Sequence, residues 1–155
     1  LTHRVIADRI ANCAENWNIH NKVYDTNSEK RMQLLGTALS NLKVLPEYKT
    51  AYISLSQEEL DRHDFRKGDT EGFVNYGLAL EGIVFAAIFI ENKQEQIIKI
   101  SFRSKGDFSV NAFARQNFEG GGHINAAGGK SDLSLKETLD RFESIHPQYK
   151  DELTK

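Results

Sequence analysis

Residues 82–104 read GIVFAAIFIENKQEQIIKISFRS, and this stretch decides the fold. Its first ten residues are apolar almost throughout, which is typical of a strand covered on both faces. A polar turn at Asn92 and Lys93 follows, and the chain then alternates between apolar and more polar side chains. This alternation puts Ile98, Ile100 and Phe102 on one face, and Ile97, Lys99, Ser101 and Arg103 on the other. We therefore expect a β-hairpin whose first strand is buried.

The sequence on either side of this hairpin alternates between helical and extended patterns. Thr26, Ser56 and Ser134 are each followed three residues later by Glu, the spacing of a capping box at the start of a helix. The expected helices cover residues 3–17, 26–45, 56–62, 70–80, 109–118 and 134–146, and the expected strands cover residues 48–55, 82–91, 96–104 and 126–131. This order predicts an α/β fold of the α+β type, in which one mixed β-sheet is flanked by helices and preceded by an N-terminal helical linker.

Composition excludes several classes of protein. The 155 residues carry 20 Lys+Arg against 22 Asp+Glu, a net charge of -2, which argues against a duplex-DNA binder with a large basic face. The single cysteine, Cys13, excludes a disulfide framework and a multi-cysteine zinc site, and it indicates a reducing, cytoplasmic compartment. No apolar run approaches the roughly 20 residues that a membrane span needs, so we expect no membrane partner.

The densest chemical signal lies in residues 101–129, SFRSKGDFSVNAFARQNFEGGGHINAAGG. Arg103, Ser104 and Lys105 stand at the predicted end of a strand. Cationic residues outnumber the one acid, Asp107, from residue 96 to 117, although the whole chain is slightly acidic. A guanidinium gives bidentate, charge-assisted hydrogen bonds to phosphate, so this segment predicts a local anion site.

The glycine run in the same segment supports this prediction. Gly120, Gly121 and Gly122 allow a turn with positive φ, in which successive N–H groups form a nest for anionic oxygens. His123 follows at once and Asn125 two residues later, and an imidazole can donate to a phosphate oxygen. Taken separately, each feature has a plainer interpretation: a flexible turn, a solvated histidine, or a surface ion pair of the arginine.

Three short motifs resemble one protein family. GGGHINAAGG, at residues 120–129, resembles the Gly-Gly-Gly-His signature of the DHH-associated domain, the C-terminal domain of many DHH-family phosphoesterases. SFRSKG, at residues 101–106, resembles the Arg-Ser element of the same domain. Asp69-Thr70-Glu71-Gly72, followed by Val74-Asn75, resembles a segment of the nanoRNase branch, the bifunctional oligoribonucleases and 3'-phosphoadenosine 5'-phosphate phosphatases. The resemblance covers roughly residues 25 to 145.

The resemblance implies a parent enzyme with a separate catalytic domain. In that family an upstream domain with an Asp-His-His triplet holds two divalent metal ions, usually manganese, that activate water. This chain contains no such triplet, and its closest string, with His63 and Asp64, is expected on a solvated surface loop. We therefore expect residues 1–25 to be the remnant of the catalytic domain and linker, and residues 26–155 to be the substrate-binding domain. The chain itself should bind no metal and should not catalyse alone.

The resemblance also assigns roles to the site residues. Arg103, Ser104 and Lys105 would contact the substrate backbone, and Gly120, Gly121, Gly122, His123 and Asn125 would surround a phosphate or ribose. Glu71 and Asn75 are further candidates beside the ligand. The implied partners are a nucleotide or short single-stranded oligonucleotide, the upstream catalytic domain, and a second copy in a homodimer.

Two other functions fit the same residues. One is the equivalent domain of an exopolyphosphatase-like or cyclic-dinucleotide phosphodiesterase, for which Tyr76, Phe108 and Phe118 as stacking platforms would discriminate, since linear polyphosphate needs none. The other is a stand-alone nucleic-acid-binding module, which should bind longer single strands with a steep salt dependence.

Overall fold

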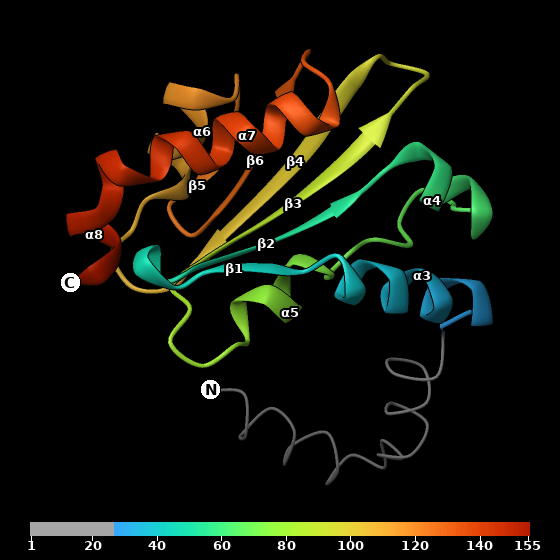
Figure 1. Cartoon of the computed structure of the whole chain (residues 1–155), viewed down its shortest axis with the longest axis horizontal. Coiled ribbons are helices and arrows are strands. Elements are labelled where there is room, and N and C mark those ends of the chain that lie inside the picture. Colours follow the sequence, from blue (N-terminus) through green and yellow to red (C-terminus); the bar gives the residue numbers. More distant parts are fainter. Residues whose placement is uncertain (1–26) are drawn as a thin grey trace, which may run out of the picture.

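The computed structural model of the chain describes residues 27–155 (Figure 1). The helix expected over residues 3–17 and the cap expected at Thr26 lie outside these residues. The described part folds around one six-stranded sheet with the order β1-β2-β3-β4-β6-β5. The strands are β1 (Lys43–Leu45), β2 (Thr50–Leu55), β3 (Phe85–Asn92), β4 (Ile97–Ser104), β5 (Gly121–His123) and β6 (Ala126–Ser131). Only β2 and β3 pair in parallel, so the sheet is mixed, as expected.

The predicted hairpin forms the centre of this sheet. β3 and β4 pair antiparallel from Phe85 opposite Ser104 to Asn92 opposite Ile97. The first five residues of β3 are buried, because both faces of this strand are covered. In β4 the burial alternates with a period of two, as the sequence predicts.

Helices lie on both sides of the sheet (Figure 1). They are α3 (Glu29–Ser40), α4 (Gln57–Arg62), α5 (Val74–Leu78), α6 (Val110–Asn117), α7 (Leu135–Ile145) and α8 (Lys150–Thr154), with short 3-10 turns at Pro46–Tyr48 and His146–Tyr149. The capping boxes predicted at Ser56 and Ser134 are both formed and start α4 and α7. This arrangement confirms the predicted fold class.

One face of the sheet carries a closed aromatic core under α6 and α7. Phe85, Phe89 and Phe102 from the strands meet Phe113 of α6 and Phe142 of α7, and all five are essentially inaccessible to solvent. Their rings pack mostly edge-to-face or tilted, as at Phe89 and Phe142, whose centroids lie 4.9 Å apart. Such pairs contribute beyond their buried area, so these rings stabilise the packing of α6 and α7 on the sheet.

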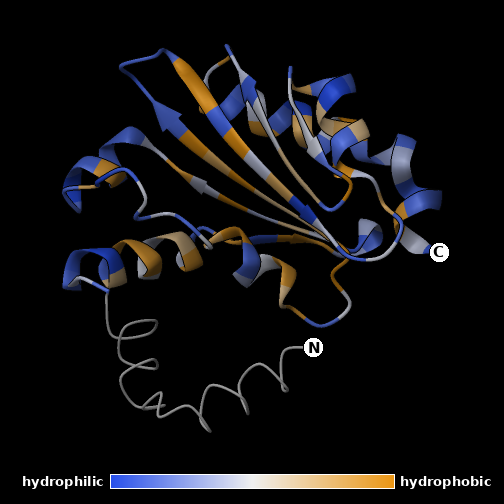
Figure 2. Cartoon of the chain, turned by 180° about the vertical axis from the view of Figure 1, so that it is seen from behind, coloured by the Kyte–Doolittle hydropathy of each residue, from blue (hydrophilic) through white to orange (hydrophobic). Residues whose placement is uncertain are grey.

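The other face is only half covered. A second cluster, with Leu34 and Ala38 of α3, Leu60 of α4 and Val74 of α5, packs on Ile53, Leu55, Ala86 and Ile88 of β2 and β3. The neighbouring strands β4, β6 and β5 belong to no part of that cluster. Figure 2 shows the hydrophobic colour concentrated on the central strands of the sheet. We call this side of β4, β6 and β5, which lies outside the second cluster of residues 27–155, the open face.

Three details of the sequence prediction were wrong. Helix α3 is capped by Ser28, whose Oγ accepts from the N–H of Arg31, and the helix ends at Ser40, where a short edge strand, β1, follows. The helix expected over residues 70–80 is reduced to α5, because positive φ at Gly72 breaks its start and no side chain caps it. At the C-terminus, Leu153 of α8 is buried in the aromatic core and holds the last turn against it.

Candidate functional site

A row of three residues crosses the open face. Arg103 of β4 pairs with Ala126 of β6, and Ala126 pairs with His123 of β5. Paired residues of a regular antiparallel ladder point to the same face, and two strand spacings separate the outer strands by roughly 9.5 Å. The ladder is distorted at β5, since a Cβ on Gly121 would face Arg115 of α6. The structure therefore brings Arg103 and His123, 20 residues apart in sequence, to the two sides of one small alanine.

The floor around this row is made of small residues. In the next row Ser101 pairs with Gly128, which pairs with Gly121. Beyond it Lys99 pairs with Lys130. A flat ligand could lie against the strands here, because Ala126 and Gly128 of β6 carry no long side chain.

The glycine run is a strand and not the expected turn. Gly121 and Gly122 belong to β5, and only Gly122 has a positive φ, of 155°. A Cβ on Gly120 would lie 2.0 Å from the carbonyl oxygen of Gly128, and a Cβ on Gly122 would lie 2.5 Å from that of Ala126. The glycines are thus needed where two backbones approach closely.

The N–H groups of this run do not form an open nest. Gly120 donates to the carbonyl oxygen of Ala114, and Gly122 donates to Oδ1 of Asn111 at 3.0 Å. The physical reason is that β5 is an edge strand, whose outward N–H groups α6 satisfies.

Asn111 and Arg115 of α6 also belong to the site, although the sequence did not predict them there. They stand one turn apart on α6, and Nε of Arg115 donates to the same Asn111 oxygen at 3.1 Å. A Cβ on Gly121 would lie 3.5 Å from this guanidinium, so Arg115 runs alongside the glycine strand. The i, i+4 spacing was visible in the sequence, but the pairing of α6 with the glycine run was not.

Ser104 and Asn125 hold the strands of the site together through hydrogen bonds. The buried hydroxyl of Ser104 donates to the carbonyl oxygen of Phe108 at 2.7 Å. Nδ2 of Asn125 donates to Oγ of Ser104 at 2.9 Å and to the carbonyl oxygen of Gly106 at 3.0 Å. These bonds tie the end of β4 to the β5–β6 hairpin and so fix Arg103 relative to His123.

The electrostatics of the row favour an anion. None of the ion pairs between described residues includes Arg103, Lys105 or Arg115. Arg103 is half-buried and its Nη1 donates to its neighbour's carbonyl oxygen, while Lys105 and His123 are exposed. By contrast, Lys99 and Lys130 are paired with Glu95 and Glu119.

The segment with Glu71 and Asn75 borders the open face. Gly77 of α5 packs against Ala51 and Ala86, and Ala86 is the strand neighbour of Arg103. Both candidates are exposed, and the carbonyl oxygen of Glu71 accepts from Arg31 at 2.8 Å. The structure thus brings α5 beside the row.

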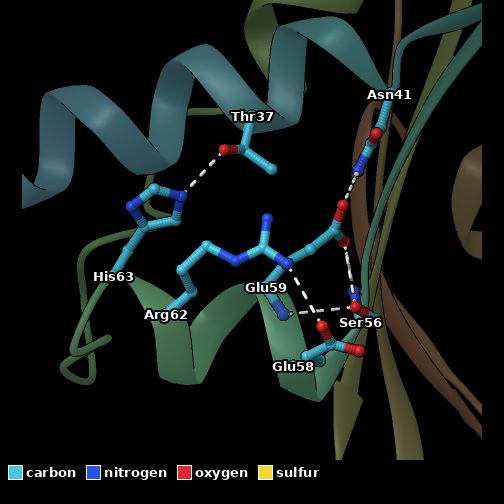
Figure 3. A network of polar contacts seen from close by, with 7 residues as sticks. All are labelled: Thr37, Asn41, Ser56, Glu58, Glu59, Arg62 and His63. Atoms are coloured by element: carbon cyan, nitrogen blue, oxygen red, sulfur yellow. Dashed lines mark hydrogen bonds and ion pairs between the residues drawn. The ribbon is translucent and has the colours of Figure 1, made fainter.

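His63 and its neighbours form a structural network away from the row (Figure 3). Nε2 of His63 lies 2.8 Å from Oγ1 of Thr37, so the histidine is tied to α3 and is not simply solvated. The carboxylate of Glu59 accepts hydrogen bonds from Asn41 and from Ser56, the N-cap residue of α4. Partial burial raises the pKa of Glu59, but these hydrogen bonds outweigh the burial and hold the pKa below its ordinary value. This network joins α3 to α4.

No group of three or more His, Cys, Asp or Glu side chains within residues 27–155 could hold a metal ion. Asp64, the other residue of the string near His63, forms an ion pair with Lys30. The described residues therefore do not fit a two-metal centre. No helix in this part of the chain is long and apolar enough to cross a membrane.

Residues 46–146 match the DHHA1 domain, and they include the row and the glycine strand. The chain belongs to the DHHA1 domain family. This assigns it to the domain associated with DHH phosphoesterases, as the motifs at Arg103 and His123 indicated.

Two solved structures of longer proteins are similar to this chain over part of their length. The crystal structure of an exopolyphosphatase-related protein from Bacteroides fragilis is 39% identical, with a TM-score of 0.92, over 99% of this chain and 45% of that one. A pGpG-specific phosphodiesterase from Vibrio cholerae shares the fold at 14% identity, with a TM-score of 0.55, over 77% of this chain and 38% of that one. The chain thus spans less than half of either protein. No curated protein matches it.

Proposed function

We propose that residues 26–155 are the substrate-binding domain of a DHH-family phosphoesterase and that the open face holds the phosphates of a nucleotide or short oligonucleotide. The observation that carries the proposal is the row in which Arg103 and His123 flank small residues and form no ion pair with a carboxylate of residues 27–155. Membership of the DHHA1 family supports it.

The residues of the row would act as phosphate ligands. The guanidinium of Arg103 can donate two parallel hydrogen bonds to one phosphate, and His123 can donate a third from the opposite side. Lys105 and Arg115 add positive charge at the rim. Ser104 and Asn125 would serve by holding the strand end, since their polar atoms already bind each other.

We propose that the chain belongs to the nanoRNase branch, because residues 69–75 resemble a segment of that branch. The substrate would then be a short oligoribonucleotide or a 3',5'-bisphosphonucleotide. The similar Bacteroides fragilis structure is described as exopolyphosphatase-related, and the Vibrio cholerae enzyme is specific for pGpG, a linear dinucleotide. Linear polyphosphate is therefore the second candidate. The two differ in the bases, which polyphosphate lacks.

Hydrolysis itself is a proposal about a longer protein. In such an enzyme two divalent metal ions, usually manganese, would supply the activated water, and a catalytic domain beyond residues 26–155 would have to hold them. The part of the chain that the structure describes offers no such set of ligands. A cytoplasmic location and a homodimer likewise remain predictions.

Calorimetric titration of the 155-residue chain tests the binding role. The ligands are 3'-phosphoadenosine 5'-phosphate, the dinucleotide pApA and tripolyphosphate. Arg103→Gln should weaken nucleotide binding about tenfold or more, the loss expected for one charge-assisted hydrogen bond. Arg62→Gln on α4 is the matched control and should change nothing. Equal binding by wild type, Arg103→Gln and His123→Gln would overturn the proposal.

A further inference from the structure

A hollow lies on the same side of the sheet as Arg103, at the opposite end of the strands. Its volume is about 550 Å³, and it is enclosed by α4, the loop of residues 65–70 and the β3–β4 hairpin. Leu60, Phe65 and Ile90 form an apolar wall, and Thr70, Lys67 and Lys99 add polar groups. Figure 1 shows α4 near the end of the sheet where β3 turns into β4.

The hollow and the phosphate row share strand β4. Lys99 lines the hollow and Arg103 belongs to the row, and the four residue steps from one to the other span roughly 13 Å along the strand. Both side chains point to the same face, because the strand alternates with a period of two. Ser101 and Gly128 lie between them, so no bulky side chain of β4 or β6 separates the two places.

The acids around the hollow are already engaged. Asp61 accepts from the side-chain amide of Gln57, and Glu91 accepts from the backbone N–H of Gln57. Glu95 is paired with Lys99.

The amino group of Lys67, in contrast, has no carboxylate within ion-pair distance among the described residues. Its charge nevertheless reaches the hollow: the hydrogen bond from Lys99 lowers the pKa of Glu95, and Lys67 adds a weaker effect in the same direction. The hollow therefore combines an aromatic and aliphatic wall with one cation outside any ion pair of the described residues, and with three carboxylates that each already have a hydrogen-bond or ion-pair partner.

We infer that this hollow is a second subsite, which holds a base of an extended oligonucleotide whose phosphate lies between Arg103 and His123. An apolar wall that includes an aromatic ring suits the face of a base, and Lys67 suits the phosphate next to it. The inference rests on the proposed function of the open face and adds a preference for ligands long enough to reach both places.

The subsite gives the chain a dependence on ligand length. Adenosine monophosphate contacts the row alone, whereas the tetranucleotide pApApApA also reaches the hollow. Polyphosphate of similar length meets Lys67 and Lys99 but gains nothing from Leu60, Phe65 and Ile90. The tetranucleotide should therefore bind more tightly than either.

The test is titration of the 155-residue chain and its variants with adenosine monophosphate and with pApApApA. Lys67→Gln, and Phe65→Leu, which keeps the apolar volume but removes the ring, should each weaken the tetranucleotide roughly fivefold, the lower end of the loss expected for one base–aromatic contact. They should leave the mononucleotide unchanged. Lys150→Gln, on the other side of the sheet, is the matched control.

NMR gives a second readout that does not depend on a variant folding normally. Adding pApApApA to the wild-type chain should shift the amide signals of residues 65–70 and 94–99, and adding the mononucleotide should not. If Arg103→Gln weakens both ligands but Lys67→Gln and Phe65→Leu weaken neither, the subsite is wrong and the proposed function stands. If Arg103→Gln weakens neither ligand, or the wild type binds neither, both fail.

Discussion

Strand β4 shows two different surfaces to the two sides of the sheet. Toward α6 and α7 it contributes Ile98, Ile100 and Phe102 to a closed core, and all three are buried. Toward the open face it presents Lys99, Ser101 and Arg103, none of which belongs to the second cluster of buried residues. A strand alternates its side chains, so adjacent positions of one short segment separate stability from binding. Substitutions on the two faces should therefore have separable effects.

The largest loss of stability is expected on the closed face. Phe102→Ala removes a ring that packs against Phe85, Phe113 and Phe118, and it should lower the free energy of unfolding by about 3–5 kcal/mol. Denaturant unfolding measures the loss. A loss below about 1 kcal/mol would mean that this core is loosely packed.

A smaller loss is expected at the glycine strand. The Cβ of Gly120→Ala would meet the Gly128 carbonyl oxygen at 2.0 Å, so the strands must move apart at a cost of roughly 2–3 kcal/mol. Gly36→Ala is the control, because it is exposed within α3 and a Cβ there would meet nothing within 4 Å. It should stabilise the chain by up to about 1 kcal/mol. Equal effects of the two substitutions would contradict the close approach of β5 and β6.

A pH-dependent effect of about 1 kcal/mol is expected from His146 in the closed core. Burial lowers the pKa of His146, although the hydrogen bond from Nδ1 to the Phe142 carbonyl oxygen opposes this. The unfolded chain then takes up a proton near pH 6.5, and the folded imidazole takes one up only at a lower pH. Stability is complete above this pH and should fall by about 1 kcal/mol between pH 8 and 5.5.

Replacing the imidazole isolates this contribution. In His146→Leu the pH-dependent loss between pH 8 and 5.5 should be smaller by about the same amount, as measured by urea unfolding at each pH. The absolute stability of the variant does not affect the comparison. Parallel pH profiles for wild type and variant would show that His146 has the same pKa in both states.

Much of the closed face could be predicted from the sequence. The alternation in residues 96–104 gave the two faces of β4, and the Ser-Glu spacing located the starts of α4 and α7. These features depend on local periodicity and local hydrogen bonds, which a sequence displays directly.

The open face could be predicted only in part. Arg103 and His123 were selected by their chemistry, but their common row depends on β6 lying between β4 and β5. The glycine run carries no periodicity, so it looked like a turn. Asn111 and Arg115 gained their place from the packing of α6 along an edge strand, and such a contact between distant segments leaves no local pattern.

The central claim is that the open face binds phosphate without supporting the fold, and Arg103→Gln tests it most directly. The variant and the wild type are unfolded in urea and titrated with 3'-phosphoadenosine 5'-phosphate in parallel. We predict that the free energy of unfolding changes by less than about 0.5 kcal/mol, as for most surface substitutions, while the dissociation constant rises about tenfold or more. An unchanged dissociation constant, at any change in stability, would contradict the claim.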